Sequence, residues 1–230
     1  MEHDMATAAA RLLEAALPHV TFDGWSEATF RAAAAEAGLS PELARALCPR
    51  GALDLAVAFH HRGDRAMEAA LAGRDLSQVR FRDRVALAVR LRLEGADREV
   101  VRRGAALFAL PQNAATGAAL VWGTADAIWR ALGDRSDDIN WYTKRATLSA
   151  VYSATVLFWL ADESAGHAAT WEFLDRRIGD VMRFELFKAR VRENPVLGRI
   201  LEGPLKALGR LRPPAGPPPD LPGRADGGRT

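Results

Sequence analysis

Apolar residues recur along most of this chain at the three-to-four-residue spacing of an amphipathic α-helix. Alanine and leucine dominate these segments and β-branched residues are sparse, which favours an all-α fold. The segments are separated by Gly, Pro and Ser residues that end or begin helices. The pattern predicts helices at Thr7–Leu17, Ser26–Ala37, Pro41–Leu47, Leu53–His61, Leu76–Glu94, Arg98–Leu110, Gln112–Leu132, Ile139–Asp162 and Ala168–Arg192.

Several helix ends have a specific signal. Pro18 is expected to end the first helix, because an interior proline removes a backbone hydrogen bond. Ser26 is expected to cap the second helix. Gly38 and Leu39 then form a turn in which Ser40 is the N-cap and Pro41 occupies the first helical position.

The most unusual segment is the predicted helix that begins at Ile139. Its first turns carry Trp141 and Tyr142 beside Lys144 and Arg145, and Ala146–Ala161 then contains no charged residue. A helix that is apolar on nearly every side is buried or lines something apolar. Large rings beside cations are typical of a protein-docking surface. The alternative is that the two rings only plug the start of a buried helix.

These residues also resemble the signature of a known family. The resemblance is to the ubiquinone (coenzyme Q) biosynthesis protein nine family in its alphaproteobacterial form. It is dense across Asp137–Asp180, looser from Leu12 to Leu110, and weak in the tail. The positions that carry it are Asn140–Ala146, Ala150–Tyr152, Thr155, Asp162–Ser164 and Thr170–Leu174.

The N-terminal third resembles a different group, the TetR-type regulators. The similar residues are Leu13–Leu17, Trp25-Ser26 and Ala34–Ser40. In those regulators the helix after the Gly-Leu-Ser turn enters the major groove, where an uncompensated basic surface contacts phosphates. Across this unit the cations are matched one for one by acids, namely Arg31, Arg45 and Arg50 by Glu27, Glu36 and Glu42. A scaffold role without nucleic acid is therefore favoured over DNA binding.

Together the two resemblances imply a homodimeric, TetR-like helical bundle with a helix-turn-helix-like N-terminal unit. TetR-type proteins place a ligand cavity among the following helices, here Leu76–Glu94, Gln112–Leu132 and Ile139–Asp162. The family binds isoprenoid lipids or quinone precursors there. The large apolar candidates for the cavity wall are Trp122, Ile128, Trp129, Leu148, Tyr152 and Trp159. For any single one of them ordinary core is the more common role, so the prediction rests on the set of helices.

Catalytic and metal-binding patterns are weak, so neither an enzyme nor a cofactor or metal is expected. His60 and His61 are adjacent and diverge on a helix, and no Glu-x-x-His occurs to build a di-iron bundle. Asp162, Glu163 and His167 straddle a helix break, where capping is the simpler role. An oxygenase, the third class considered, would need bound iron.

A C-terminal amphipathic stretch, Val196–Leu211, suggests membrane contact. A leucine face beside a basic face is the pattern of a helix that lies on anionic lipid. Folding back on the protein or across a dimer seam is an equal alternative. The membrane-contact candidates are Leu197, Ile200, Leu201, Leu208, Leu211, Lys206 and Arg210.

The expected organisation has four parts. Residues 1–62 form the helix-turn-helix-like unit, 63–193 the lipid-binding and dimerisation bundle, 194–212 the membrane-contacting helix and 213–230 a disordered Pro/Gly-rich tail. The longest uncharged run is shorter than the roughly 20 residues of a spanning helix. An acidic start without a transit peptide, a single Cys48 and a net charge of +2 fit a bacterial cytoplasmic protein, peripheral on the inner membrane.

The resemblance implies a non-catalytic accessory role in ubiquinone biosynthesis. Proteins of this family support the demethoxyubiquinone hydroxylase, to which this chain would present a polyprenylated quinone intermediate. Trp141, Tyr142, Lys144 and Arg145 match the family's surface patch for that hydroxylase. The alternative function is a TetR-type, ligand-responsive transcriptional regulator.

Overall fold

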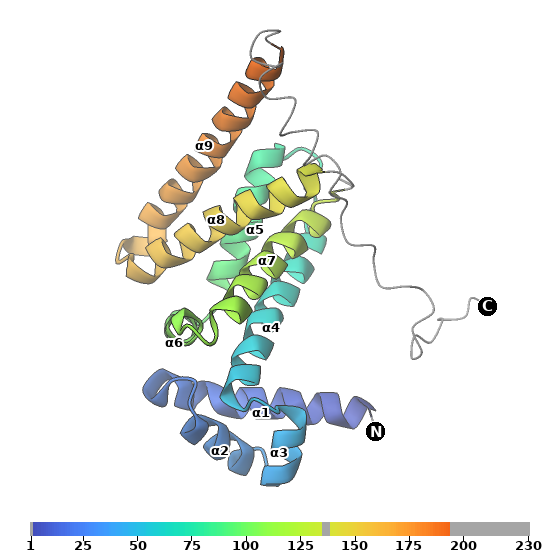
Figure 1. Cartoon of the computed structure of the whole chain (residues 1–230), viewed down its shortest axis with the longest axis vertical. Coiled ribbons are helices and arrows are strands. Elements are labelled where there is room, and N and C mark those ends of the chain that lie inside the picture. The colour runs from blue at the N-terminus through green and yellow to red at the C-terminus, as the bar shows by residue number, and fades with distance from the viewer. Residues whose placement is uncertain (1, 135–138, 194–230) are drawn as a thin grey trace, which may run out of the picture.

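The structure is a computed structural model that describes residues 2–134 and 139–193. Within these ranges it is helical and contains no strand, so the predicted all-α class is confirmed (Figure 1). The elements are α1 Glu2–Asp23, α2 Glu27–Glu36, α3 Pro41–Leu47, α4 Ala52–Ala72, α5 Phe81–Glu94, α6 Arg98–Ala109, α7 Ala114–Ala131, α8 Ile139–Ala161, the 3₁₀ turn η1 Ala165–His167, and α9 Ala168–Glu193.

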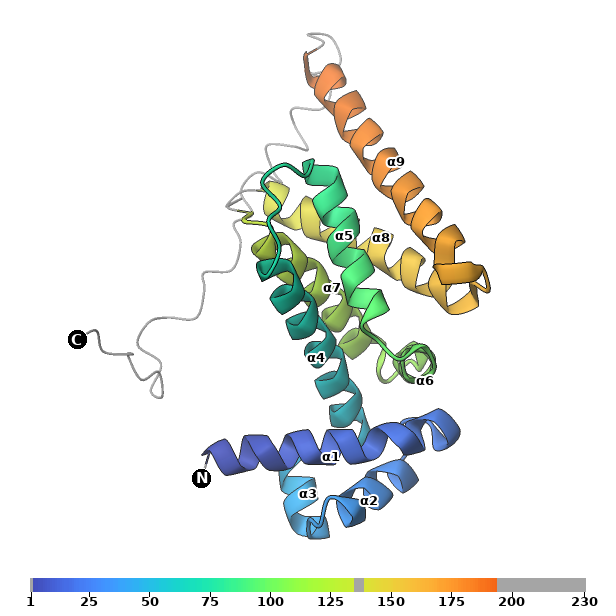
Figure 2. The same cartoon turned by 180° about the vertical axis from the view of Figure 1, so that it is seen from behind.

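The helices form two packed groups joined by α4. In both views α1 lies across one end of the molecule with α2 and α3 against it, while α4 rises from there beside α5 and α7, and α8 packs on α7 (Figures 1 and 2). The first group has its own core around Leu12, Phe30 and Leu55. The second has a core around Ile128 and Trp159. Helix α9 leans away from the bundle and packs on α5 and α8.

The structure corrects the predicted end of the first helix. Helix α1 continues through Pro18 to Asp23. Its apolar face continues too, because Val20 beyond the proline is as completely buried as Ala16 before it. The hydroxyl of Thr21 donates to the Pro18 carbonyl. Burial of this face outweighs the hydrogen bond that proline removes.

The caps predicted for the next two helices are present. Ser26 Oγ accepts from the backbone N–H of Thr29, and Ser40 Oγ accepts from that of Leu43. Gly38, between them, has a φ of +65°, a left-handed conformation that glycine adopts without steric cost. These local signals therefore define the helix-turn-helix-like unit.

Other boundaries differ because packing extends or shortens a helix. Helix α4 runs across residue 62, where the sequence places a domain boundary, and buries Met67 and Leu71 in the second core. Helix α5 begins only at Phe81, five residues later than expected.

Residues 194–212 and 213–230, the expected membrane helix and tail, lie outside the described residues. Within the described ranges, none of the helices has both the length and the apolar character needed to cross a bilayer.

Candidate functional site

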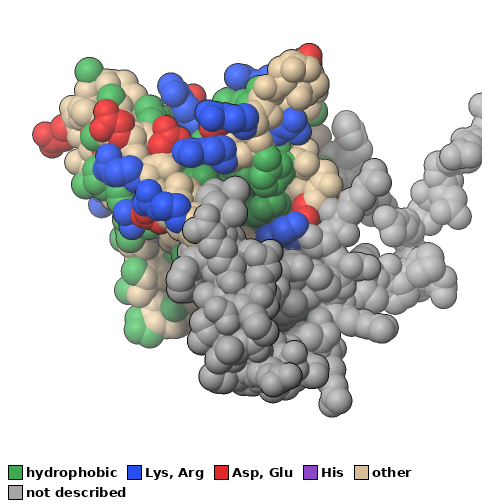
Figure 3. Space-filling view, turned by 90° about the horizontal axis from the view of Figure 1, so that it is seen from above, with side chains coloured by type: hydrophobic (Ala, Val, Ile, Leu, Met, Phe, Trp, Pro, Cys, Tyr) green, Lys and Arg blue, Asp and Glu red, His purple; other side chains and the backbone are tan. Residues whose placement is uncertain are grey.

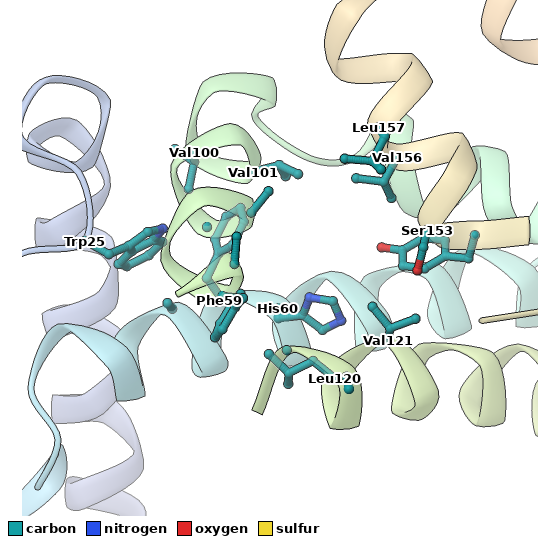
Figure 4. Close-up of a pocket in the computed structure, with 18 of the residues that line it drawn as sticks. Trp25, Phe59, His60, Val100, Val101, Leu120, Val121, Ser153, Val156 and Leu157 are labelled. Atoms are coloured by element: carbon teal, nitrogen blue, oxygen red, sulfur yellow. The ribbon is translucent and has the colours of Figure 1, made fainter. Parts of the chain in front are cut away.

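A cavity of about 270 Å³ lies where α4, α6, α7 and α8 meet. Figure 4 shows side chains from all four helices around it: Phe59 and His60 from α4, Val100 and Val101 from α6, Leu120 and Val121 from α7, and Ser153, Val156 and Leu157 from α8. Most of these side chains are apolar. Leu157 is 65% exposed, so the α8 side of the cavity reaches the surface.

Small residues on facing helices allow this cavity to form. Gly104 and Ala105 on α6 and Gly117 and Ala118 on α7 all line it. A Cβ at Gly117 would come within 2.8 Å of the Cβ of Phe108, so glycine permits the close approach of α6 and α7. Helix α6 therefore forms one wall of the cavity, although the sequence predicted the walls only from Leu76–Glu94, Gln112–Leu132 and Ile139–Asp162.

One wall of this first cavity is polar and built around a buried arginine. Arg92 is 3% exposed, and its Nε donates to Asp64 Oδ1 at 2.7 Å while its Nη2 donates to the His60 carbonyl at 3.0 Å. Thr124 Oγ1 lies 2.9 Å from Asp64 Oδ1 and 2.8 Å from His60 Nε2. Tyr152 completes this wall from α8.

Burial keeps the His60 and Tyr152 side chains of this wall uncharged. Removal from water, together with the charge of Arg92, lowers the pKa of His60 to about 4, so its imidazole is neutral at pH 7. Burial also raises the pKa of Tyr152, whose phenol keeps its proton. The only full charges in the cluster are those of the Arg92–Asp64 pair, which cancel.

A second cavity, of about 300 Å³, opens between α5, α7, α8 and α9. Its walls include Phe81, whose ring stacks on that of Trp129 with 5.5 Å between centroids, and Ile178 and Val181 from α9. Arg82 and Lys144 stand on its wall. The end of the bundle where α5 and α8 begin shows Lys and Arg side chains gathered around apolar ones (Figure 3).

The structure divides the six predicted wall residues among different places. Tyr152 lines the first cavity, whereas Trp129 and Leu148 line the second. Trp122 borders a shallow groove between α7 and α8. Ile128 and Trp159 are buried in the core and line none of these spaces, as the core alternative had it.

Sequence reasoning missed the residues of α4 and α6. Phe59, Val100 and Phe108 line the first cavity, while α5 contributes only Arg92 and Leu93. The available signal was the small-residue content of Arg98–Ala118, which includes Gly104 and Gly117.

The aromatic residues at the start of α8 form a partly exposed cluster with α7. The Trp141 ring lies 4.8 Å from that of Tyr142 and 5.9 Å from that of Trp122. Lys144 Nζ donates to Asp134 Oδ1 at 2.7 Å and lies over the Trp129 ring. We call Trp122, Trp141, Tyr142 and Lys144 the aromatic patch.

Arg145, expected on this surface, is instead an interior residue. It is 2% exposed, and its guanidinium bonds Asp126 at 2.6 Å and Asp134 at 3.1 Å. Its Cζ lies 4.0 Å from the centroid of the Trp141 ring. The helical turn points this side chain inward between two carboxylates, so Arg145 supports the aromatic patch from below.

On the helix-turn-helix-like unit, several basic side chains are paired with acids. Arg45 bonds Glu27, and Arg62 bonds Glu14. Arg50 lies 2.6 Å from Asp54. Phosphate binding needs cations that are not already committed to carboxylates. These three arginines are already paired with carboxylates.

Asp162 acts as a cap at the break between α8 and α9. Its two oxygens accept from the backbone N–H groups of Ser164 and Thr170 and from the Thr170 hydroxyl. These bonds, with the Thr170 side chain as the largest contribution, hold the pKa of Asp162 far below its ordinary value. Among the described residues, His, Cys, Asp and Glu side chains form no group of three placed to hold a metal ion.

Comparison with known proteins gives matches over most of the chain. Residues 114–185, which span α7, α8 and much of α9, match the model of the COQ9 family. The probable ubiquinone biosynthesis protein coq9 of Dictyostelium discoideum, described as mitochondrial, is 31% identical over 191 residues, which are 80% of this chain and 62% of the relative. Ubiquinone biosynthesis protein COQ9, also described as mitochondrial, is 33% identical in Drosophila melanogaster and 32% in Homo sapiens, over 77% and 75% of this chain.

The chain spans 62%, 56% and 57% of the lengths of these three relatives. Among solved structures, the TetR transcriptional regulator from Nitrosomonas europaea superposes with a TM-score of 0.61, covering 74% of this chain and 95% of that one. At 20% sequence identity this likeness concerns the fold. The expected TetR-like fold is confirmed.

Proposed function

The chain belongs to the COQ9 family, whose model it matches from residue 114 to residue 185, and we propose that it serves ubiquinone biosynthesis as a non-catalytic lipid-presenting protein. It binds an isoprenoid quinone intermediate and offers it to a membrane-associated hydroxylase, the enzyme of demethoxyubiquinone. Such an intermediate lies deep in a bilayer, so a protein that holds it near the enzyme raises the rate by proximity.

The observation that carries this proposal is the first cavity. Its walls are mostly apolar, it reaches the surface near Leu157, and α7 and α8, which form two of its sides, fall within the matched region. Cavities with apolar walls and a few polar groups are the usual sites of small organic ligands. The volume of about 270 Å³ is just below the usual range of such sites, so the cavity takes part of a long lipid.

The aromatic patch is the proposed contact for the hydroxylase. Trp141 and Tyr142 are only partly buried, and buried charges below hold Trp141 in place. Rigid aromatic side chains next to a cation are frequent hot spots of protein interfaces. Lys144 keeps a charge there, while Arg145 contributes through the orientation of Trp141.

A homodimer through α8 and α9 fits the exposed apolar residues of these helices. Leu157 is exposed, and the ring of Phe158 stacks on that of Phe173 at 4.6 Å between centroids. The proposed membrane contact is assigned from the sequence alone to Val196–Leu211, which lies outside the described residues.

The first experiment is mass spectrometry of lipids extracted from the gently purified protein. The proposal expects a near-stoichiometric isoprenoid quinone or a precursor that lacks its last ring substituents. Bulk phospholipid in trace amounts would contradict it and leave the cavity as a packing defect.

The docking role is tested by Trp141→Lys, with Phe22→Lys as a control. Phe22 is an exposed aromatic residue of α1, the helix that lies across the opposite end of the molecule. The proposal expects Trp141→Lys to remain folded by circular dichroism and to lose capture of the hydroxylase, whereas Phe22→Lys retains it. Loss of folding in Trp141→Lys alone would favour the view that the ring only plugs the start of α8.

The alternative, a transcriptional regulator, makes a separate prediction. A regulator would shift promoter DNA at low salt and release it as salt rises. The ion pairs of Arg45 and Arg50 argue against such a shift. A gel-shift titration at low ionic strength decides between the two functions.

A further inference from the structure

The second cavity changes from an exposed, charged mouth to a buried, apolar end. Phe81 stands at the mouth and is 45% exposed, beside the partly exposed side chains of Arg82 and Lys144. Lys and Arg side chains gather around apolar ones at this end of the bundle (Figure 3). Four residues further along the same two helices, Val85 of α5 and Leu148 of α8 are buried. A ligand that matches this gradient has a polar head and an apolar chain.

The guanidinium of Arg82 is only weakly compensated at this mouth. Its Nε lies 3.5 Å from Asp83 Oδ1, while Arg80 donates to the other oxygen of the same carboxylate at 2.7 Å. Within residues 2–134 and 139–193, the Nε of Arg82 is buried and has no hydrogen-bond partner. A buried N–H group without an acceptor costs free energy, so an acceptor supplied by a ligand is favoured there.

Positive charge is in excess around the mouth. Lys144 donates to Asp134, and the same carboxylate also accepts from Arg145. The carboxylate of Asp83 is likewise shared by two arginines. Among the described residues at the mouth, cations therefore outnumber carboxylates. Such a surface attracts an anionic head group and repels a cationic one.

The size of the cavity selects a ligand with one chain. Its volume is about 300 Å³. Because a methylene group takes up about as much room as a water molecule, roughly 30 Å³, the cavity holds about ten carbon atoms. A phospholipid has two chains, and the second would remain in water at a cost for each exposed methylene. A fatty acid, with one chain and a carboxylate, fits both the volume and the charge.

We propose that the second cavity is a fatty-acid site, in which the carboxylate lies against Arg82 and Lys144 and the chain extends between α5, α8 and α9. The chain contacts Ile178 and Val181 of α9, so a bound acid ties this helix to the bundle. The site goes beyond the quinone-presenting function, because it lies in a different cavity and takes a charged ligand.

The test compares three probes of equal chain length, decanoate, decanol and decyltrimethylammonium, by equilibrium dialysis with the full chain. Decanoate should bind about three- to fivefold more tightly than decanol, because its charged head pairs with a partly exposed guanidinium. Decyltrimethylammonium should bind most weakly. The advantage of decanoate should shrink as salt is added. Equal binding of decanoate and decanol at low salt overturns the proposal.

Arg82→Gln tests the head-group contact, with Arg90→Gln as its matched control. Arg90 is on the same helix, is similarly exposed and lies outside the cavity wall. Arg82→Gln should weaken decanoate about three- to fivefold and leave decanol unchanged, whereas Arg90→Gln should leave both unchanged. Asp83→Asn should strengthen decanoate, since it removes the carboxylate nearest to Arg82. Unchanged decanoate affinity in Arg82→Gln overturns the assigned contact.

A second pair of variants locates the chain. Val181→Phe fills the second cavity from α9, and Ala105→Phe fills the first cavity from α6. With folding checked by circular dichroism, Val181→Phe should abolish decanoate binding and Ala105→Phe should retain it. The opposite pattern would place the acid in the first cavity and overturn the proposal. If Val181→Phe does not fold, the comparison of Arg82→Gln with Arg90→Gln decides.

The fatty-acid site and the quinone-presenting function can fail separately. A protein that binds a quinone but not decanoate overturns the fatty-acid site and leaves quinone presentation standing. Decanoate binding without quinone binding supports the fatty-acid site and contradicts quinone presentation. Loss of quinone binding in Val181→Phe would show that both ligands use one space, which overturns a separate fatty-acid site.

Discussion

Two arginines, Arg92 and Arg145, are buried in this protein to the same extent, but their surroundings differ. Arg92 is held by one carboxylate and one carbonyl on the wall of a cavity. Arg145 is held by two carboxylates and by the Trp141 carbonyl, with the Trp141 ring against its face. A guanidinium has five N–H donors, so the number of acceptors around it determines what it can still do.

The difference suggests separate roles for similar chemistry. Around Arg145 the acceptors surround the guanidinium, and the arrangement fixes the position of an aromatic ring at the surface. Around Arg92 a donor is left over, and the neighbouring imidazole and phenol are neutral, which suits a site for an uncharged ligand. A buried ion pair is by itself a weak source of stability. The role of these two arginines is therefore better explained by the groups that they hold in position.

The largest effect is expected for Arg92→Leu. The substitution leaves the Asp64 carboxylate buried without its cation and should lower the free energy of unfolding by about 3–5 kcal/mol. Urea denaturation followed by circular dichroism measures the loss. The double variant Arg92→Leu with Asp64→Leu should recover much of it, because the unpaired charge is gone. A loss below about 1 kcal/mol in the single variant would mean that water reaches Asp64.

Acid should destabilise the protein through His60. Its pKa is about 4 in the folded state against an ordinary value of 6.5, so between these values the unfolded chain binds a proton that the folded protein does not. Stability is therefore complete above about pH 6.5 and falls by up to about 3 kcal/mol as the pH drops to about 4. The charged and titratable groups that face His60 are Arg92, Asp64 and His61.

The measurement is the unfolding free energy at several pH values for the unsubstituted protein and for His60→Gln. The variant should show a shallower slope between pH 6.5 and 4, which separates His60 from carboxylates that titrate in the same range. Parallel slopes would show that His60 is protonated in the folded protein.

A smaller loss is expected for Arg145→Leu, and this sharpens the comparison. Asp134 keeps Lys144 as a partner, and Asp126 keeps Arg130 at 3.0 Å and contact with water. The unfolding free energy should therefore fall by about 2 kcal/mol, less than for Arg92→Leu. Capture of the hydroxylase should weaken because Trp141 loses its support, whereas quinone affinity should not change. Loss of quinone affinity would show that the two clusters are coupled.

The smallest effects are expected at two helical glycines. A Cβ at Gly63 would lie 2.5 Å from the Arg92 guanidinium, whereas one at Gly123 would meet nothing within 4 Å. Gly123→Ala should stabilise the protein by about 0.5–1 kcal/mol through helix propensity. Gly63→Ala should instead destabilise it by about 1 kcal/mol, since displacement of Arg92 outweighs that gain. Equal stabilisation of both, measured as the urea midpoint, would mean that Arg92 moves freely.

Local patterns were sufficient for much of the fold. The caps at Ser26 and Ser40 were predicted because a side chain and its backbone partner lie three residues apart. The extents of α7 and α8 followed from long periodic segments between breakers. The end of α1 was missed because burial of Val20 against distant residues overrides the local effect of Pro18.

The candidate site was less accessible to sequence reasoning. Trp129, Leu148 and Tyr152 were expected on the wall of one cavity, whereas in the structure Tyr152 lines the first cavity and the other two line the second. Ile128 and Trp159 are also large apolar residues on the inward faces of their helices, but they are ordinary core. Periodicity tells which residues face inward, but it does not tell where neighbouring helices fail to fill the space between them.

By itself the sequence determined the helical class, the family and the aromatic start of α8, because these depend on residue order and local spacing. Only the tertiary structure decided that Gly104 and Gly117 open a cavity, that Arg145 is enclosed by Asp126 and Asp134, and that Arg92 reaches the cavity wall. These arrangements depend on contacts between residues far apart in the chain. Their geometry is set by how whole helices pack, and no local pattern encodes it.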